Sequence, residues 1–253
     1  MTFNDEDLSA RRIERRCVSC GRIFTVPAGI FDIFEDTSEL PLMCNDCFDR
    51  EMAIRERENR IRTREAMADL HLSEFELPET LRQASFDNFI PSSDRQLEVA
   101  SYAREFASND DYIFAMLGKT GNGKSHLAVA MLREWCTCEN PNCCYVTEKA
   151  LFDELVEALS SKKMATTEQV VEKYIKYQEL VIDEIGRSEP SAYKKENLLA
   201  IVMGRLDRKR KTVIIGNLTS EAFKEYFPDA VISRMSEGGR SFILKEEDYR
   251  RRK

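Results

Sequence analysis

The chain has 253 residues, of which 42% are hydrophobic and 33% are charged, and its formal net charge is −7. This size suits one α/β domain with a smaller appendage, and the acidic balance excludes a general positive field that would attract nucleic acid, so such contacts need local basic patches. The chain lacks a run of about 18 apolar residues and a signal-like start, which predicts a soluble, cytoplasmic protein with no membrane partner.

Two Cys-x-x-Cys pairs lie near the N-terminus, after a polar arm. They are Cys17/Cys20 and Cys44/Cys47, with 23 residues between them. Such pairs can place four thiolates tetrahedrally around one zinc ion, and Gly21 permits the turn that aims backbone N–H groups at sulfur. Disulfides are the alternative, but a reducing compartment disfavours them. Because four thiolates fill the coordination sphere, a structural zinc module is predicted over residues 1–47.

Interleaved glutamate and arginine follow the second cysteine pair, from Phe48 to Leu70, with sparse apolar residues between them. This alternation is typical of a largely exposed helix, which we expect to connect the zinc module to the rest of the chain over residues 48–77. Its arginines could contact nucleic acid, but the comparable number of acidic residues favours a solvated helix.

The stretch YIFAMLGKTGNGKSHL, Tyr112 to Leu127, has the pattern of a phosphate-binding loop between a strand and a helix. Glycines let the backbone N–H groups surround a polyphosphate, Lys124 is expected to place its charge at the β- and γ-phosphates of ATP, and Ser125 is expected to ligate Mg²⁺. His126 is included by its position only. The candidate nucleotide-binding residues are Gly118, Lys119, Thr120, Gly121, Asn122, Gly123, Lys124, Ser125 and His126.

Four further cysteines follow this segment, at Cys136, Cys138, Cys143 and Cys144. A second metal site is one interpretation, but the spacing matches no frequent ligand pattern. The last two cysteines also belong to the strand-like run Cys-Cys-Tyr-Val-Thr. We therefore expect two loop cysteines and two strand cysteines.

Two carboxylates end an unbroken aliphatic run, Leu-Val-Ile-Asp183-Glu184. Such a run is typical of a central parallel strand, whose carboxyl end is where ligands bind in open α/β sheets. Asp183 is expected to hold Mg²⁺ directly or through water, and Glu184 to accept a proton from the attacking water. A second buried strand, over residues 212–217, ends at Asn217, which is placed to hydrogen-bond this water or the γ-phosphate.

GKTGNGKS, LVIDE and the strand ending at Asn217 together resemble the AAA+ ATPases. The phrases LPETLRQASFDNF, VIDEIGRSEPSAY, SRM and DYR resemble one branch of them, the DnaC-type replicative helicase loaders, with the IstB-type transposition ATPases as close relatives. The likeness covers about residues 78–253. It implies an α/β fold of the P-loop NTPase type over these residues, a parallel sheet flanked by helices.

The resemblance also implies roles for polar residues outside the loop. Asn217 becomes the sensor of the γ-phosphate, Arg234 an arginine finger that acts on the nucleotide of a neighbouring subunit, and Arg250 a second sensor. A finger supplied by a neighbour implies that hydrolysis needs self-association. Without the resemblance, surface solubility would account for both arginines. The expected catalytic residues are Lys124, Asp183, Glu184, Asn217, Arg234 and Arg250.

Family members hold single-stranded DNA on the inner face of a spiral, and the resemblance implies that Ser191 and Tyr193 lie there. Lys194 and Lys195 follow as phosphate contacts, and Tyr193 could stack on a base. A hydrated loop is the alternative. Phe152 lies where this family has its initiator-specific insertion, so it could also line the DNA path.

The implied function is the loading of a DnaB-type hexameric helicase onto single-stranded DNA, with ATP, Mg²⁺ and Zn²⁺ as cofactors. The alternative is an IstB-type ATPase that binds DNA and recruits or activates a transposase. The N-terminal segment of such loaders grips the helicase, and here that segment is a zinc module with a charged helix, so the partner's identity stays open.

Overall fold

The computed structural model describes residues 12–27, 42–159, 165–187 and 189–245. The chain divides into two compact units, residues 1–63 and 64–253. The division falls within residues 48–77, the segment expected to connect a zinc module to an ATPase domain. The bounds of the three predicted domains stay predictions.

The first unit contains a short antiparallel hairpin and most of one helix. Strands β1 (Arg12–Arg16) and β2 (Ile23–Pro27) pair with Arg16 opposite Ile23, and the helix is α2 (Asn45–Leu72). Neither strand has a fully buried residue, so the hairpin builds no apolar core of its own. Among the described residues of this unit, the buried ones are cysteines, with Phe24 and Met43 packed against them.

The Glu/Arg-rich segment is helical, as predicted, and residues 52–66 are exposed along α2. The last turns differ, because Ala68 and Leu72 are buried in the core of the second unit. Opposite charges also pair on the helix surface, as Arg55 and Glu51 do at 3.2 Å. A pair of this kind stabilises a helix by only about 0.2–0.5 kcal/mol.

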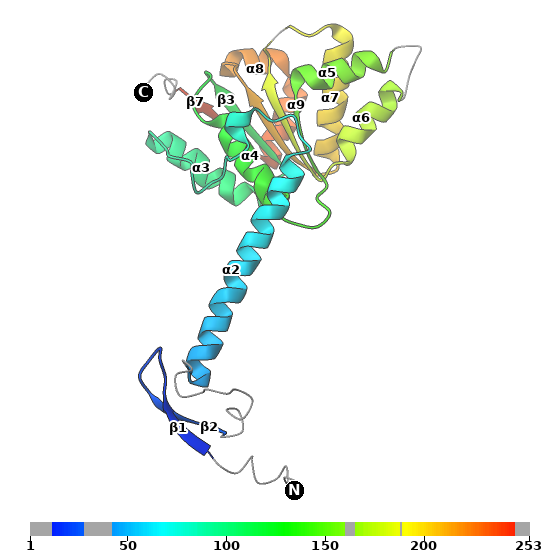
Figure 1. The fold of residues 1–253 in the computed structure, drawn as a ribbon. Helices are drawn as coiled ribbons and strands as arrows, with labels where there is room; N and C mark the ends of the chain where they lie inside the picture. The colour runs from blue at the N-terminus through cyan, green and yellow to red at the C-terminus, as the bar shows by residue number, and fades with distance from the viewer. Residues whose placement is uncertain (1–11, 28–41, 160–164, 188, 246–253) are drawn as a thin grey trace. The chain divides into compact units, whose positions relative to one another are not determined.

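The second unit is built on a five-stranded parallel sheet, in agreement with the predicted fold class (Figure 1). The strand order is β4-β5-β6-β3-β7, and all described pairings within the sheet are parallel. The strands are β3 (Ile113–Gly118), β4 (Cys143–Thr147), β5 (Glu179–Ile185), β6 (Lys211–Gly216) and β7 (Gly239–Leu244). The central residues of β3, β4, β5 and β6 are buried in succession rather than alternately, because helices cover both faces of the sheet, whereas the edge strand β7 is partly exposed.

Two apolar cores lie on the two faces of this sheet. Alternate residues of β3 show the division, since Ile113 and Ala115 belong to one core and Phe114 and Met116 to the other. The first core contains residues of α5 (Glu148–Glu157), α6 (Thr167–Lys176), α7 (Ala192–Asp207), α8 (Ser220–Tyr226) and α9 (Asp229–Gly238). The second contains residues of α3 (Asp94–Phe106), α4 (Lys124–Trp135) and the end of α2, with the short 3-10 turn η2 (Glu79–Leu81) beside it.

Parallel pairing brings the carboxyl ends of all five strands to one edge of the sheet. Strand β6 lies between β3 and β5, and Gly216 at its end is opposite both Leu117 and Ile185. The segments that follow these three strands are therefore neighbours. No helix in the described part of the chain is long and apolar enough to cross a membrane.

Candidate nucleotide and zinc sites

The phosphate-binding loop connects β3 to α4 through backbone conformations that favour glycine. Gly118, Gly121 and Gly123 have φ values of +123°, +81° and +89°. A Cβ atom on Gly118 would meet the Leu244 carbonyl oxygen at 2.0 Å, and one on Gly123 would meet the Phe89 ring at 2.6 Å. Glycine is required at both positions because the loop is packed against β7 and against the segment that precedes α3.

Lys124 is buried at the start of α4, and its ammonium group lies inside the loop. Its Nζ donates to the carbonyl oxygens of Gly118 at 2.7 Å and Lys119 at 2.6 Å, and to Asn122 Oδ1 at 2.9 Å. Burial lowers the pKa of Lys124 to about 8, although Asp183 opposes the shift. A buried ammonium group surrounded by loop carbonyls has an unmet need for negative charge, which a phosphate group would supply.

Two of the residues predicted to bind nucleotide, Asn122 and His126, have side chains that contact segments packed against the loop. The Asn122 side chain is buried and donates to the Leu244 carbonyl at 2.9 Å. His126 lies with its Nε2 atom 2.9 Å from the Ser85 carbonyl oxygen, and its ring is 5.3 Å from that of Phe89. Lys119 and Thr120, by contrast, are exposed at the tip of the loop.

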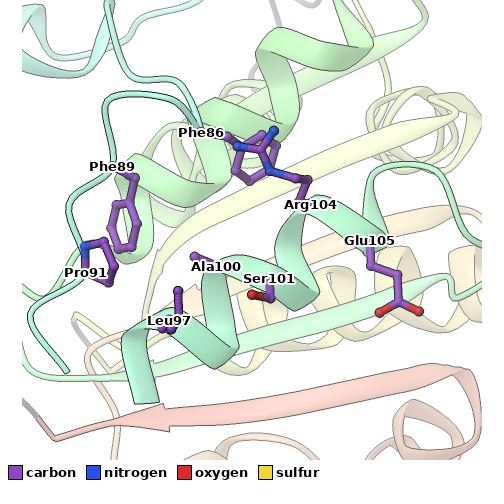
Figure 2. Close-up of a pocket in the computed structure, with 8 residues that line it drawn as sticks. All are labelled: Phe86, Phe89, Pro91, Leu97, Ala100, Ser101, Arg104 and Glu105. Carbon is purple, nitrogen blue, oxygen red and sulfur yellow. The ribbon is translucent and has the colours of Figure 1, made fainter. Parts of the chain in front are cut away.

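A hollow of about 480 Å³ lies beside the loop, between α3 and the segment before it. Figure 2 shows Phe86, Phe89 and Leu97 on its walls. No residue of the loop itself lines the hollow. Phe89 thus separates this hollow from Gly123 of the loop.

Asp183 and Ser125 are brought together at the carboxyl end of β5. Asp183 is buried and accepts hydrogen bonds from the Tyr145 hydroxyl at 2.8 Å, from the Glu184 N–H at 2.6 Å and from the Ser125 side chain. Burial raises the pKa of Asp183, and these three hydrogen bonds oppose the rise. A hydroxyl and a buried carboxylate are oxygen ligands suited to Mg²⁺, whose charge would offset the cost of burying the carboxylate.

Glu184 and Asn217 lie at the same edge as Asp183. Glu184 has a left-handed backbone, with φ +63°, and its Oε1 accepts from the Arg187 guanidinium at 2.7 Å. Asn217 is exposed and follows β6 directly. The predicted sensor and the predicted general base therefore come from neighbouring strands.

Arg234 is not brought to this edge of its own chain. It lies on α9 and forms an ion pair with Asp207 at 2.6 Å. Asp207 ends α7, four residues before β6 begins at Lys211, and so belongs to the opposite, amino edge of the sheet. Arg250, the predicted second sensor, lies outside the described residues.

The residues predicted to contact DNA lie at the start of α7 and on α5. Ser191 precedes the helix and is exposed, whereas the Tyr193 hydroxyl donates to the Leu155 carbonyl at 3.0 Å. Lys194 Nζ lies 5.5 Å from the centre of the Phe152 ring, and Phe152 is itself buried in the core. Lys195 Nζ lies near the Glu225 carbonyl at 3.4 Å. In this conformation the two aromatic rings are engaged in packing, and the lysines remain partly exposed.

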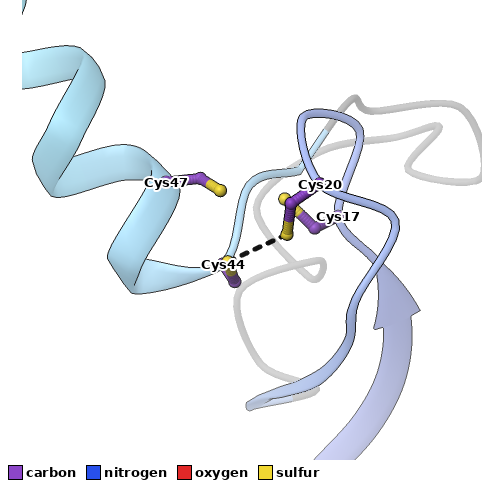
Figure 3. A group of neighbouring side chains, drawn as sticks. All are labelled: Cys17, Cys20, Cys44 and Cys47. Atoms are coloured by element: carbon purple, nitrogen blue, oxygen red, sulfur yellow. Dashed lines mark hydrogen bonds between the residues drawn. The ribbon is translucent and has the colours of Figure 1, made fainter.

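The four N-terminal cysteines converge in the first unit, as Figure 3 shows. The Sγ atoms of Cys17, Cys20, Cys44 and Cys47 all lie within 4.8 Å of one another, and Cys20 is the exposed member. A backbone hydrogen bond from Cys44 is the main cause that lowers the pKa of Cys17 to about 6, which favours the thiolate. Four sulfur donors at this separation fit a tetrahedral zinc site.

The second group of cysteines forms no comparable cluster among the described residues. Cys143 and Cys144 begin β4, as predicted, and Cys136 follows α4 with its sulfur 3.3 Å from that of Cys143. Cys138 is exposed. A second metal site therefore has no support in the described part of the chain.

Comparison with known proteins gives the family of this chain. The family described as IstB-like ATP binding protein matches residues 43–253, which is most of the chain. The replicative helicase loader DnaC of Buchnera aphidicola subsp. Acyrthosiphon pisum is 31% identical over 175 residues, covering 67% of this chain and 70% of the relative. The chain is a DnaC-type AAA+ ATPase of the IstB-like family. The replicative helicase loader DnaC of Escherichia coli strain K12 is 28% identical over 177 residues, 68% of this chain and 71% of the relative.

Solved structures show the same fold. The crystal structure of the DnaC helicase loader superposes with a TM-score of 0.58 at 20% identity, covering 66% of this chain and all of the other (100%). The AMPPCP-bound DnaA from Aquifex aeolicus gives a TM-score of 0.55 at 19% identity, with 66% of this chain and 52% of the other covered. Both therefore support the parallel sheet flanked by helices.

Sequence reasoning missed three polar residues at the carboxyl edge of the sheet. They are Tyr145, which donates to Asp183, Arg187, which pairs with Glu184, and Glu148, which is buried. Tyr145 lies in a buried strand and Glu148 follows that strand directly. These positions indicate that both side chains have hydrogen-bond partners, because buried polar side chains need them. The partners themselves belong to distant segments.

Proposed function

We propose that this protein loads a replicative DnaB-type hexameric helicase onto single-stranded DNA. ATP binding and hydrolysis switch its binding of the helicase and of the DNA. The main support is that the Ser125 side chain, at the end of the phosphate loop, is hydrogen-bonded to Asp183 at the end of β5. The relatives of this chain include replicative helicase loaders. The IstB-like family description keeps transposase recruitment as the alternative. The curated relatives named as loaders favour loading.

In the proposed site the loop N–H groups and Lys124 hold the phosphates of ATP. Ser125 and Asp183 would hold magnesium, which would supply positive charge to the phosphate oxygens. Glu184 accepts the proton of the attacking water, and Asn217 orients that water or the γ-phosphate. The guanidinium of Arg187 contacts one oxygen of the Glu184 carboxylate, Oε1, and the described hydrogen bonds leave the other oxygen for this role.

Arg234 and Arg250 complete the proposed catalytic set. Arg234 forms an exposed ion pair with Asp207, and this pair must open before the guanidinium can act on the nucleotide of a neighbouring subunit. Such a pair costs little to break, on the order of 1 kcal/mol or less. Hydrolysis therefore depends on self-association, and a dilute protein turns over slowly.

The remaining proposals concern the partners. The four cysteines hold a structural zinc ion, and the zinc module with α2 contacts the helicase. Ser191 faces the DNA and Lys194 and Lys195 contact its phosphates. Tyr193 stacks on a base and Phe152 lines the DNA path only if both rings leave their present packing. The protein acts in the cytoplasm.

The test is helicase loading onto a single-stranded DNA circle, with wild-type protein and the Lys124→Ala variant. We expect loading by the wild type and none by the variant, because the ammonium group inside the loop is lost. Equal loading by both would refute the ATP switch. ATP-dependent filaments on double-stranded DNA, together with no loading by the wild type, would instead support transposase recruitment.

A further inference from the structure

Glu148 is a buried acidic residue that the chemistry above does not use. It is the first residue of α5, directly after β4, and only 2% of it is exposed. Burial raises the pKa of its carboxyl group. Because a buried carboxyl group is costly unless it is hydrogen-bonded, its partners indicate what it stabilises.

The partners of Glu148 come from two distant segments. Its Oε1 accepts from the Gly186 N–H at 3.1 Å and from the Tyr226 hydroxyl. Gly186 and Arg187 form the turn that follows β5, and Tyr226 ends α8. One carboxylate thus connects the start of α5, the turn after Glu184 and the helix that follows Asn217.

The turn that Glu148 holds is an unfavourable one. It closes with a hydrogen bond from the Arg187 N–H to the Glu184 carbonyl at 3.3 Å. Glu184 and Gly186 both adopt left-handed backbone conformations, with φ +63° and +76°. This region is uncommon for a residue with a Cβ atom, so Glu184 keeps it only where surrounding contacts enforce it.

The same turn is packed against the segment that carries Asn217. A Cβ atom on Gly186 would lie 2.4 Å from the Leu218 side chain, and Leu218 is the neighbour of Asn217. A shift of the turn would therefore move the backbone of Glu184 and disturb the segment after β6.

We propose that Glu148 is a positioning residue for ATP hydrolysis, which holds the turn that carries Glu184 and ties it through Tyr226 to the segment that carries Asn217. The inference rests on the proposed ATPase function. In the described hydrogen bonds, Glu148 contacts none of the residues of the phosphate loop. Its loss therefore affects the position of Glu184 and not the affinity for the nucleotide.

The test compares three variants with a matched control, using full-length protein at a concentration and with single-stranded DNA that support assembly. Glu148→Leu removes the acceptor, Glu148→Gln keeps an acceptor oxygen, and Tyr226→Phe removes one donor. Tyr174→Phe is the control, because the Tyr174 hydroxyl donates to the carboxylate of Glu154 at 2.6 Å in a partly buried pair away from the turn.

We expect Glu148→Leu to lower kcat roughly 10- to 100-fold, the size of effect that a displaced catalytic group gives, with nucleotide Kd changed less than about threefold. Tyr226→Phe should lower kcat about three- to tenfold, Glu148→Gln should stay within about threefold of wild type, and Tyr174→Phe should leave kcat unchanged. Wild-type kcat in folded Glu148→Leu protein would overturn the proposal. So would an equal loss of kcat in Tyr174→Phe, or a Glu148→Gln variant as impaired as Glu148→Leu.

Hydrogen exchange of the peptide around Gly186 gives a second measurement that does not need turnover. Slow exchange in the wild type and fast exchange in Glu148→Leu would show the restraint directly, and equal exchange in both would overturn it even if kcat fell. A wild-type protein that holds this turn but hydrolyses no ATP under any assembly condition would refute the proposed ATPase function, and the positioning role with it.

Discussion

Burial determines the direction of the pKa shift of three ionisable side chains at or near the nucleotide site. The side chains of Lys124, Asp183 and Glu148 are each nearly inaccessible to solvent. Burial lowers the pKa of Lys124 and raises the pKa of Asp183 and of Glu148, which favours the neutral form of each group. Hydrogen bonds hold all three in place. Of these three groups, Lys124 and Asp183 belong to the nucleotide site, where bound phosphate and magnesium would offset their buried charges.

Nucleotide affinity should fall in alkaline solution because of Lys124. The pKa of Lys124 is lowered to about 8 in the folded protein, so the ammonium form predominates well below that pH and is lost as the pH rises through it. Since phosphate binding needs the charged form, Kd for ATP should increase by up to about tenfold for each pH unit above 8. Titration of ATP binding between pH 7 and 9.5 measures this.

Lys124→Ala is the control for the pH dependence. It should bind ATP weakly and with little change in Kd over the same range. A wild-type Kd that stays constant to pH 9.5 would contradict the assignment of this titration to Lys124.

At the level of secondary-structure elements, one buried arginine joins helices and strands at the amino edge of the sheet. Arg205 on α7 is fully buried and donates to the Tyr174 carbonyl at 2.7 Å, the Lys211 carbonyl at 2.6 Å and the Thr212 hydroxyl at 2.9 Å, among others. Its guanidinium group thus connects α6, α7 and β6. No acidic side chain faces it among its described hydrogen bonds, so backbone carbonyls satisfy the buried charge.

Replacing Arg205 by leucine should strongly destabilise the second unit. The variant leaves several buried carbonyl groups without donors, so the free energy of unfolding should fall by about 3–5 kcal/mol. Arg208→Leu is the matched control, because Arg208 forms a partly exposed pair with Glu172 and its loss should cost less than about 1 kcal/mol. Urea unfolding measures both, and similar midpoints for the two variants would contradict this expectation.

Across the whole molecule, the two units should respond independently to loss of zinc. A zinc-selective chelator with excess Mg²⁺ should unfold the cysteine-containing unit, because its described core is little more than three buried cysteines. ATP affinity should stay within about twofold, since the nucleotide site lies entirely in the second unit. Circular dichroism and ATP titration before and after chelation measure the two effects.

Cysteine variants provide the control for zinc. Metal analysis should find that Cys47→Ser loses the ion and that Cys138→Ser keeps it, because Cys138 is exposed and belongs to no described cluster. Wild-type protein purified without zinc would contradict the assignment.

Hydrolysis should require two subunits if Arg234 acts on a neighbour. Arg234→Ala and Glu184→Gln should each be inactive alone, the first lacking the finger and the second lacking the base. Mixing them should restore ATPase activity, because Glu184→Gln subunits offer Arg234 to the intact sites of the other variant. Steady-state ATPase of the mixture measures this, and failure to recover activity would contradict a finger supplied between subunits.

Much of the fold and part of the site could be predicted from local patterns. The glycine spacing before Lys124 and the aliphatic run before Asp183 identify the loop and a central strand, because a positive φ and burial on both faces leave local signatures in the sequence. The paired cysteines are similarly local. The hydrogen-bond partners of the Asn122 and His126 side chains could not be predicted, because these partners, Leu244 and Ser85, are remote in sequence.

The sequence by itself determined that the chain would bind phosphate between a strand and a helix and would gather four thiolates near its N-terminus. Only the tertiary structure decided which polar groups meet. Tyr145 lies 38 residues from Asp183, and Glu148 lies 38 residues from Gly186. Parallel pairing of β4 with β5 brings both pairs to one edge, and such pairings between distant segments leave no periodic trace in the residues themselves.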